Sequence, residues 1–183
     1  MKRFKHVSFE SMKTVPKEIA PNAIICRDYA KDIFKHVNDD GQGLILLGGY
    51  GTMKTTLAVC ILRSALEQGI SGLFIPMCSL MDNLYTMRTL NREEWARYEQ
   101  RIRSTRLLVL DDFGSESTEQ GWVLSKVDSI LTERYNKMLP TIITTNYTLE
   151  DMAGTYSGRL MDRLMSTNKV LIFDGKSHRK KVE

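Results

Sequence analysis

The chain has 183 residues, of which 42% are hydrophobic and 26% charged, with a formal net charge of +4, an ordinary balance for one globular domain. No apolar run approaches the roughly 20 residues of a membrane-spanning helix, and the first residues, MKRFKHVSFE, lack the apolar stretch of a signal peptide. Cys26, Cys60 and Cys78 match neither a disulfide framework nor a CxxC metal site, so we expect a reducing cytoplasm, while the modest positive charge is compatible with nucleic-acid binding without requiring it.

Five short apolar runs predict the strands of one sheet, at residues 44–47, 73–76, 107–110, 141–145 and 170–173. These runs are continuous rather than alternating, which is typical of strands covered on both faces. Helix-like segments separate them, and strands that alternate with helices form parallel sheets. We therefore predict an α/β fold with a central parallel five-stranded sheet. A single domain would span residues 1–183, with an N-terminal arm at 1–20 and a basic C-terminal tail at 175–183.

Two of the predicted helices have clear signals. The first covers residues 55–68, follows a glycine-bearing loop and ends at Gly69, a favourable C-terminal cap. The second begins near Ser117, where Ser-Thr-Glu-Gln offers a capping box, and ends before Pro140. Ligands of parallel sheets bind beyond the carboxyl ends of the strands, so we expect the functional residues to follow the strands.

The loop after the first strand predicts a phosphate-binding site. It comprises Gly48, Gly49, Tyr50, Gly51, Thr52, Met53, Lys54, Thr55 and Thr56, and a helix follows it. The glycines allow backbone N–H groups to surround a phosphate, Lys54 would reach the β- and γ-phosphates, and Thr55 would ligate Mg²⁺. The alternative interpretation is a glycine-rich hairpin before a helix.

Met53 departs from the GxxxxGK[ST] pattern, which has glycine at this position. Glycine is favoured there because a tight loop can require positive φ, which costs other residues on the order of 1 kcal/mol or more. We expect nucleotide binding to survive, because the backbone N–H remains, and turnover to be weakened.

Asp111 and Asp112 directly follow the third apolar strand. We assign Asp111 to the metal, through water, and Asp112 to polarising the attacking water. The alternative is that both acids merely end a strand in solvent. Asn146 follows the fourth strand and would contact the γ-phosphate or the attacking water, although asparagine also commonly begins a turn.

Together, the segments GGYGTMKTT, LLVLDDFGSE, ERYNKMLPTIITTN and SGRLMDRL resemble the ATPase domain of the DnaC/DnaI helicase loaders and the related IstB transposition helper ATPases. The resemblance extends from about Phe9 to Arg179. It implies a P-loop AAA+ three-layer fold, with a lid domain short or absent, that assembles side by side with ATP between neighbouring subunits. The chain would then be either one domain of a longer protein or a shortened relative.

The resemblance also implies roles for residues outside the P-loop. Asn146 would be the sensor 1 residue, Arg163 the arginine finger that reaches a neighbour's γ-phosphate, and Arg179 the sensor 2 arginine. Arg159, one helical turn before Arg163, would assist it. For each arginine the alternative is a solvated cation on a helix or tail.

As a helicase loader, the chain would use ATP and Mg²⁺ to control self-assembly, single-stranded DNA binding and delivery of a hexameric replicative helicase. The resemblance also implies that residues 79–103 line the single-stranded DNA path. They carry Arg88, Arg92, Arg97, Arg101 and Arg103 interleaved with Tyr85, Trp95 and Tyr98, and basic and aromatic residues together can hold phosphates and stack bases. An ordinary amphipathic helix fits this stretch equally well. The alternative functions are a transposition helper ATPase of the IstB type, and a hydrolysis-impaired nucleotide-binding switch or decoy.

Overall fold

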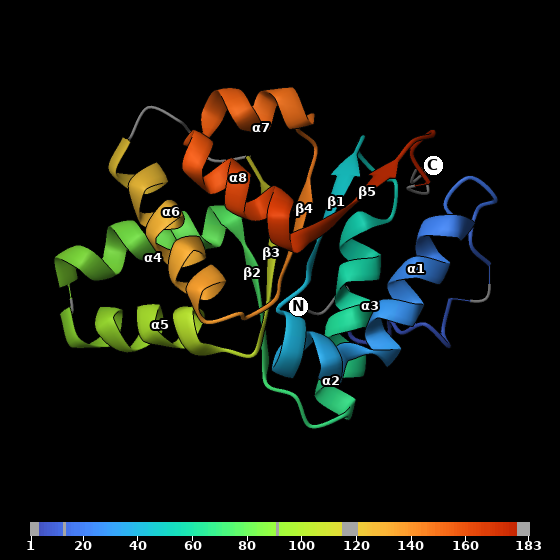
Figure 1. Ribbon diagram of the computed structural model, residues 1–183, viewed down its shortest axis with the longest axis horizontal. Coiled ribbons are helices and arrows are strands. Elements are labelled where there is room, and N and C mark those ends of the chain that lie inside the picture. The colour runs from blue at the N-terminus through green and yellow to red at the C-terminus, as the bar shows by residue number, and fades with distance from the viewer. Residues whose placement is uncertain (1–3, 13, 91, 115–120, 179–183) are drawn as a thin grey trace.

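A computed structural model describes residues 4–12, 14–90, 92–114 and 121–178. Its centre is a five-stranded sheet in the order β2-β3-β4-β1-β5, and every neighbouring pair is parallel (Figure 1). The strands are β1 (Gly43–Gly48), β2 (Gly72–Pro76), β3 (Leu107–Phe113), β4 (Thr141–Thr145) and β5 (Asn168–Phe173). The predicted parallel sheet is therefore confirmed, with strand ends within three residues of those expected from the apolar runs.

One face of the sheet packs against helices from the first third of the chain. These elements are α1 (Ala20–Lys31), α2 (Ile33–Lys35), the π-helical turn η2 (His36–Asp40) and α3 (Lys54–Glu67). Their buried side chains form one apolar core with the strands, in which Cys26, Ile33 and Leu57 are fully buried. The predicted helix at 55–68 is α3. Phe9 and Ile19 of the predicted arm also lie in this core.

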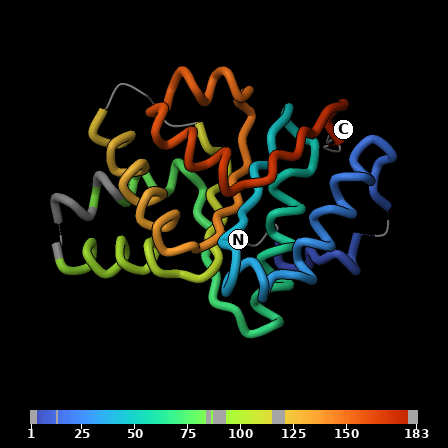
Figure 2. The backbone as a smooth tube through the Cα atoms, in the orientation of Figure 1, coloured from blue at the N-terminus to red at the C-terminus, as the bar shows by residue number. Residues whose placement is uncertain are grey.

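The other face packs against α4 (Met77–Leu90), α5 (Arg92–Ser104), α6 (Gly121–Asn136), α7 (Leu149–Thr155) and α8 (Gly158–Thr167). The result is three layers, helices, sheet and helices (Figure 1). Helices α4 and α5 run side by side at one end of the molecule (Figure 2). The second predicted helix is α6; its expected capping box, residues 117–120, lies outside the described residues. None of the described helices is long and apolar enough to cross a bilayer.

Arg134, near the end of α6, connects this helix by hydrogen bonds to α5 and to the start of β4. Its side chain is fully buried, and its guanidinium donates hydrogen bonds of 2.7–3.0 Å to the carbonyl groups of Ile102, Thr105 and Pro140 and to the hydroxyl of Thr141. A buried cation is tolerated only when its donors find acceptors, and here polar atoms of three segments supply them. Arg134 therefore links the start of β4 to the end of α5 and to the residue that follows it.

Candidate functional site

The loop between β1 and α3 is strongly curved. Gly48 has φ +150° and Gly51 has φ +76°, conformations that side-chain-bearing residues rarely adopt. A Cβ atom at Gly51 would also lie 2.1 Å from the Ser177 hydroxyl oxygen. Gly51 is therefore required both for the turn and for the close approach of residues 174–178.

Met53 adopts the left-handed conformation that makes glycine favourable at this position. Its φ is +71° and its ψ is +10°, directly before the first residue of α3. Its side chain is half-buried and packs against the core beneath the loop. Packing thus offsets part of a backbone strain on the order of 1 kcal/mol or more.

Lys54 joins the loop to the end of β4. The residue is only 5% exposed, and its ammonium group donates hydrogen bonds to the carbonyl groups of Gly48 and Gly49 at 2.7 Å each. It also donates to Oδ1 of Asn146 at 3.0 Å. Two of the strand-end residues singled out from the sequence are thereby in direct contact, although 92 positions separate them.

Asp111 joins α3 to β3 at the same edge of the sheet. Its Oδ1 accepts hydrogen bonds from the hydroxyl groups of Thr55, at 2.8 Å, and Thr144, at 2.6 Å. Burial raises the pKa of the Asp111 carboxyl above its ordinary value, and hydrogen bonds from Thr144 and Thr55 oppose that rise. A cation beside this carboxylate would offset the cost of burying its charge.

Asp112 differs from its neighbour in conformation and exposure. The register of β3 with β4 shifts between Leu110 and Phe113, and Asp112 has φ +56° within this irregularity. Its backbone N–H donates to the Thr144 hydroxyl at 3.0 Å, while the residue is exposed and lines the cavity beside the loop. The two adjacent acids therefore occupy different environments, one buried against Thr55 and one facing the cavity.

Thr144 was not identified from the sequence, although it contacts both acids. It lies inside the apolar run of β4, and threonine is a common residue of strands, so nothing in the local sequence singles it out. The only available signal was the register of two parallel strands, which places Thr144 beside the end of β3.

A cavity of about 570 Å³ lies over the loop. Residues 50–56, Asp112 and Asn146 line it, together with Phe4, Val7 and His178, which sequence reasoning did not include. The backbone N–H of His178 donates to the Gly51 carbonyl at 3.0 Å, and its ring lies 3.4 Å from the Glu18 carboxylate. The two ends of the described chain thus border the same cavity.

These residues fit a nucleotide with its magnesium ion. The N-terminus of α3 begins at Lys54, directly after the loop, and helix N-termini favour anions, while the Lys54 side chain supplies a cation. Thr55 and Asp111 offer adjacent hard oxygen ligands, as Mg²⁺ prefers when phosphates complete its coordination. Within the described ranges no cluster of three or more His, Cys, Asp or Glu side chains is placed to hold a metal alone.

The two predicted arginines that the structure describes, Arg159 and Arg163, lie outside the lining of the cavity over the loop. Arg163, on α8, contacts Thr132 and Tyr135 of α6 and does not line the cavity over the loop. Arg159 is exposed on the same helix. Arg179 lies outside the described residues, so its role stays a prediction.

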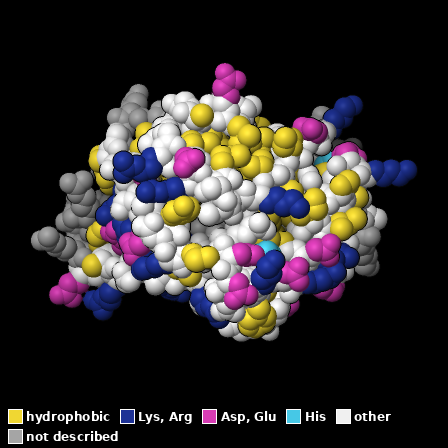
Figure 3. Space-filling model, viewed as in Figure 1, with side chains coloured by type: hydrophobic (Ala, Val, Ile, Leu, Met, Phe, Trp, Pro, Cys, Tyr) yellow, Lys and Arg dark blue, Asp and Glu magenta, His cyan; other side chains and the backbone are white. Residues whose placement is uncertain are grey.

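The described part of the expected DNA-binding stretch favours the amphipathic alternative for three of its residues. Arg103 pairs with Glu99 and Glu133, while Trp95 and Tyr98 pack against the core. Arg97 and Arg101 are exposed. On the face shown in Figure 3, Lys and Arg side chains are interspersed with Asp and Glu.

Comparison with known families gives a match over most of the chain. A family described as IstB-like ATP binding protein matches residues 32–183. Replicative helicase loader DnaI of Bacillus subtilis (strain 168) is 25% identical over 174 residues, covering 87% of this chain and 55% of DnaI. Replicative helicase loader DnaC of Escherichia coli (strain K12) is 30% identical over 183 residues, covering 97% of this chain and 71% of DnaC. The chain thus spans little more than half the length of DnaI.

The fold is similar to that of a solved relative. The crystal structure of the DnaC helicase loader superposes with a TM-score of 0.83 at 25% sequence identity, covering 95% of this chain and all of that one. This agreement confirms the predicted AAA+ α/β fold.

Proposed function

Because this chain belongs to the family of IstB-like ATP-binding proteins, we propose that it is the ATPase module of a helicase loader in DNA replication. Its ATP state would control self-assembly, single-stranded DNA binding and delivery of a hexameric replicative helicase. One observation carries the proposal: the ends of β3 and β4 meet the loop after β1 through the Thr55–Asp111 and Lys54–Asn146 hydrogen bonds. Those contacts bring together the groups that a magnesium triphosphate requires.

Nucleotide binding is assigned to residues 48–56. Their backbone N–H groups would surround the phosphates, and Lys54 would exchange its carbonyl partners for phosphate oxygens. Thr55 and Asp111 would hold Mg²⁺, Asp111 through water, and the bound ion would neutralise charge on the phosphates. The hydroxyl of Thr144 keeps the Asp111 carboxylate oriented toward Thr55.

Hydrolysis is assigned to groups that face the cavity. Asp112 lines it and would accept a proton from the attacking water. Asn146, also in the lining, would orient that water or the γ-phosphate through its amide. Arg163 does not line this cavity, so it would serve a nucleotide bound by a neighbouring copy, and Arg179 would act as the sensor 2 arginine.

The choice of partner rests on the relatives. DnaI and DnaC are both described as replicative helicase loaders, and DnaC aligns with 97% of this chain. A hexameric helicase and single-stranded DNA are therefore the proposed partners. Exposed Arg97 and Arg101 are the described cations of residues 79–103 that remain candidates for phosphate contacts.

Two alternatives have observations in their favour. The family description favours a transposition helper ATPase of the IstB type, which would share every nucleotide residue and differ in its partner. The left-handed Met53 favours a nucleotide-binding switch or decoy that hydrolyses ATP poorly.

A capture experiment with defined partners separates these functions. The purified chain is presented to a replicative helicase and to a transposase, each with and without ATP, and turnover is measured with and without single-stranded DNA. ATP-dependent capture by the helicase supports the proposal, whereas capture by the transposase alone favours the first alternative. Nucleotide binding without turnover favours the second, and the absence of nucleotide binding refutes all three. Lys54→Ala is the matched control.

A further inference from the structure

The side chains of Arg103 and Arg163 pack against α6, which itself carries Arg134, and the three arginines differ in how their charge is satisfied. Arg103 forms ion pairs with Glu99 and Glu133, and Arg134 donates to four oxygen acceptors. Arg163 has a different environment. In the part of the chain that the structure describes, no carboxylate forms an ion pair with it, and it donates one hydrogen bond to a side chain, that of Thr132.

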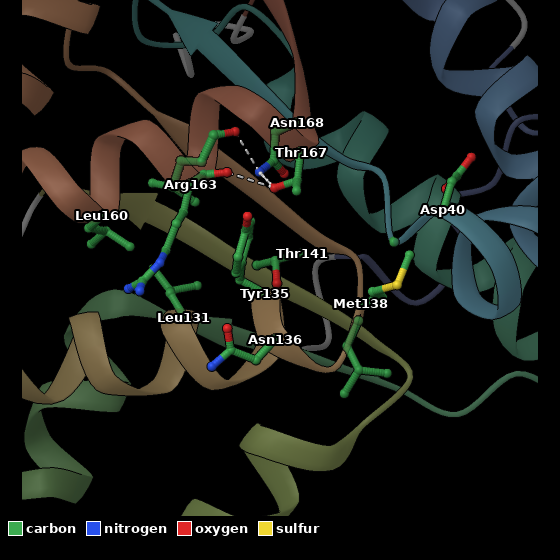
Figure 4. Close-up of a pocket in the computed structure, with 13 residues that line it drawn as sticks. Asp40, Leu131, Tyr135, Asn136, Met138, Thr141, Leu160, Arg163, Thr167 and Asn168 are labelled. Atoms are coloured by element: carbon green, nitrogen blue, oxygen red, sulfur yellow. Dashed lines mark hydrogen bonds between the residues drawn. The ribbon is translucent and has the colours of Figure 1, made fainter.

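Two residues of α6 hold the Arg163 guanidinium without neutralising it. The Thr132 hydroxyl accepts from Nη1 at 2.5 Å, and the guanidinium carbon lies 5.6 Å from the centre of the Tyr135 ring. Figure 4 shows the Arg163 side chain extending from α8 toward α6, beside Tyr135 and at the wall of a cavity of about 430 Å³. An aromatic face attracts a cation but carries no net charge, so the guanidinium stays available to an anion.

Asp128 accepts hydrogen bonds from Thr132 and from Ser157, and it thereby orients the hydroxyl that contacts Arg163. Its Oδ1 accepts from the Thr132 hydroxyl at 3.0 Å, which directs the lone pairs of that hydroxyl toward Arg163. Its Oδ2 accepts from the Ser157 hydroxyl at 2.6 Å, and Ser157 caps the N-terminus of α8 by accepting from Leu160 N–H. Asp128, Thr132 and Tyr135 are spaced i, i+4 and i+7, so they share one face of α6. The same carboxylate thus fixes both the helix that carries Arg163 and the hydroxyl that holds its tip.

We propose that Tyr135, and Thr132 as oriented by Asp128, are positioning residues that hold the Arg163 side chain extended for a nucleotide bound by a second copy of this chain. This inference rests on the proposed shared ATPase site. Misplacing a charge-stabilising group by about 1 Å can cost on the order of 100-fold in rate. Thr132 and Tyr135 therefore affect turnover, although neither lines the cavity over the P-loop of its own chain.

The test compares kcat and KM of the full chain with those of three variants of α6. Thr132→Val and Tyr135→Leu are expected to lower kcat about tenfold or more, with KM for ATP changed less than twofold, because neither residue lines the cavity over the P-loop. Tyr135→Phe keeps the aromatic face and is expected to retain most of the turnover. Lys137→Ala, just beyond the end of α6 and outside the lining of both cavities that Arg163 lines, is the matched control and should keep the full rate.

Mixing distinguishes positioning in trans from a structural effect. Asp112→Asn subunits keep Arg163, Thr132 and Tyr135 intact. When they are added to Thr132→Val subunits, they are expected to supply Arg163 to the nucleotide sites of those subunits and so restore turnover there. If no ratio of the two variants restores turnover, the Thr132→Val substitution impairs the nucleotide site of its own subunit, and the proposal is overturned. Full activity of Thr132→Val and Tyr135→Leu, with Arg163→Ala inactive, would also overturn it while leaving the shared site standing. Full activity of Arg163→Ala would refute the shared site itself.

Discussion

The hydroxyl of Thr55 donates a 2.8 Å hydrogen bond to Asp111, although 56 positions separate the two residues. Thr55 lies in the first turn of α3 and lines the P-loop cavity, and Asp111 lies near the end of β3, so the contact joins these two elements beside the cavity. Lys54 donates to Asn146, and both residues also line the cavity. Lys54, Thr55, Asp112 and Asn146 line this cavity, and Asp111 is hydrogen-bonded to it through Thr55. Their separate contributions can therefore be measured.

Lys54→Ala is expected to weaken ATP binding at least about 30-fold, because a buried cation that bonds to phosphate contributes roughly 2–3 kcal/mol. Isothermal calorimetry with a slowly hydrolysed ATP analogue measures the change. Lys169→Ala, which removes an exposed lysine of β5, is the control and should bind as the unmodified chain does. Equal affinities for the two variants would refute the site.

Met53→Gly is expected to raise ATP turnover by about two- to tenfold, because glycine adopts φ +71° without the strain that methionine bears. Met138 provides a matched control, since it also has positive φ, +53°, but does not line the cavity over the P-loop. Met138→Gly should leave turnover unchanged. A rate for Met53→Gly at or below that of the unmodified chain removes strain at this position as a cause of slow hydrolysis.

The sheet and the three strand-end motifs were predictable because each depends on neighbouring residues. Continuous apolar runs indicate buried strands, and the loop at 48–54, Asp111 and Asn146 each follow such a run directly. Thr144 was not predictable, because its contact with Asp111 depends on the register of two strands whose residues lie 33 positions apart. Phe4, Val7 and His178 reach the cavity only through the packing of both chain ends, which no local pattern specifies.

Arg134→Met is expected to lower the free energy of unfolding by about 3 kcal/mol, because it leaves buried carbonyl groups without donors. Urea denaturation measures the loss. Arg97→Met removes an arginine whose side chain is 76% exposed and should change stability by no more than about 0.5 kcal/mol. If Arg134→Met lowers the free energy of unfolding no more than Arg97→Met does, the hydrogen bonds of Arg134 contribute little to stability.

Glu99 is expected to make stability depend on pH. Burial alone would raise the pKa of its carboxyl, but hydrogen bonds from Lys126 and Arg103 outweigh burial and lower the pKa below its ordinary 4.5. A lowered pKa in the folded state means that the contribution is fully present above pH 4.5 and disappears as the pH falls through the folded-state pKa. The stability difference between the unmodified chain and Glu99→Gln should therefore shrink below pH 4.5. Glu93→Gln, at a solvent-exposed pair with Arg97, is the matched control and should change stability at neutral pH by no more than about 0.5 kcal/mol.

Thr144→Val is expected to lower turnover about tenfold while changing ATP affinity little, because Thr144 touches both acids and does not line the cavity. The substitution keeps the shape of the side chain and removes its hydroxyl, so the carboxylate of Asp111 loses one of two donors. If Thr144 acts through Asp111, the double variant Asp111→Asn/Thr144→Val should turn over no more slowly than Asp111→Asn alone. Additive losses would instead show that Thr144 acts on Asp112 independently, through the hydrogen bond to its backbone N–H.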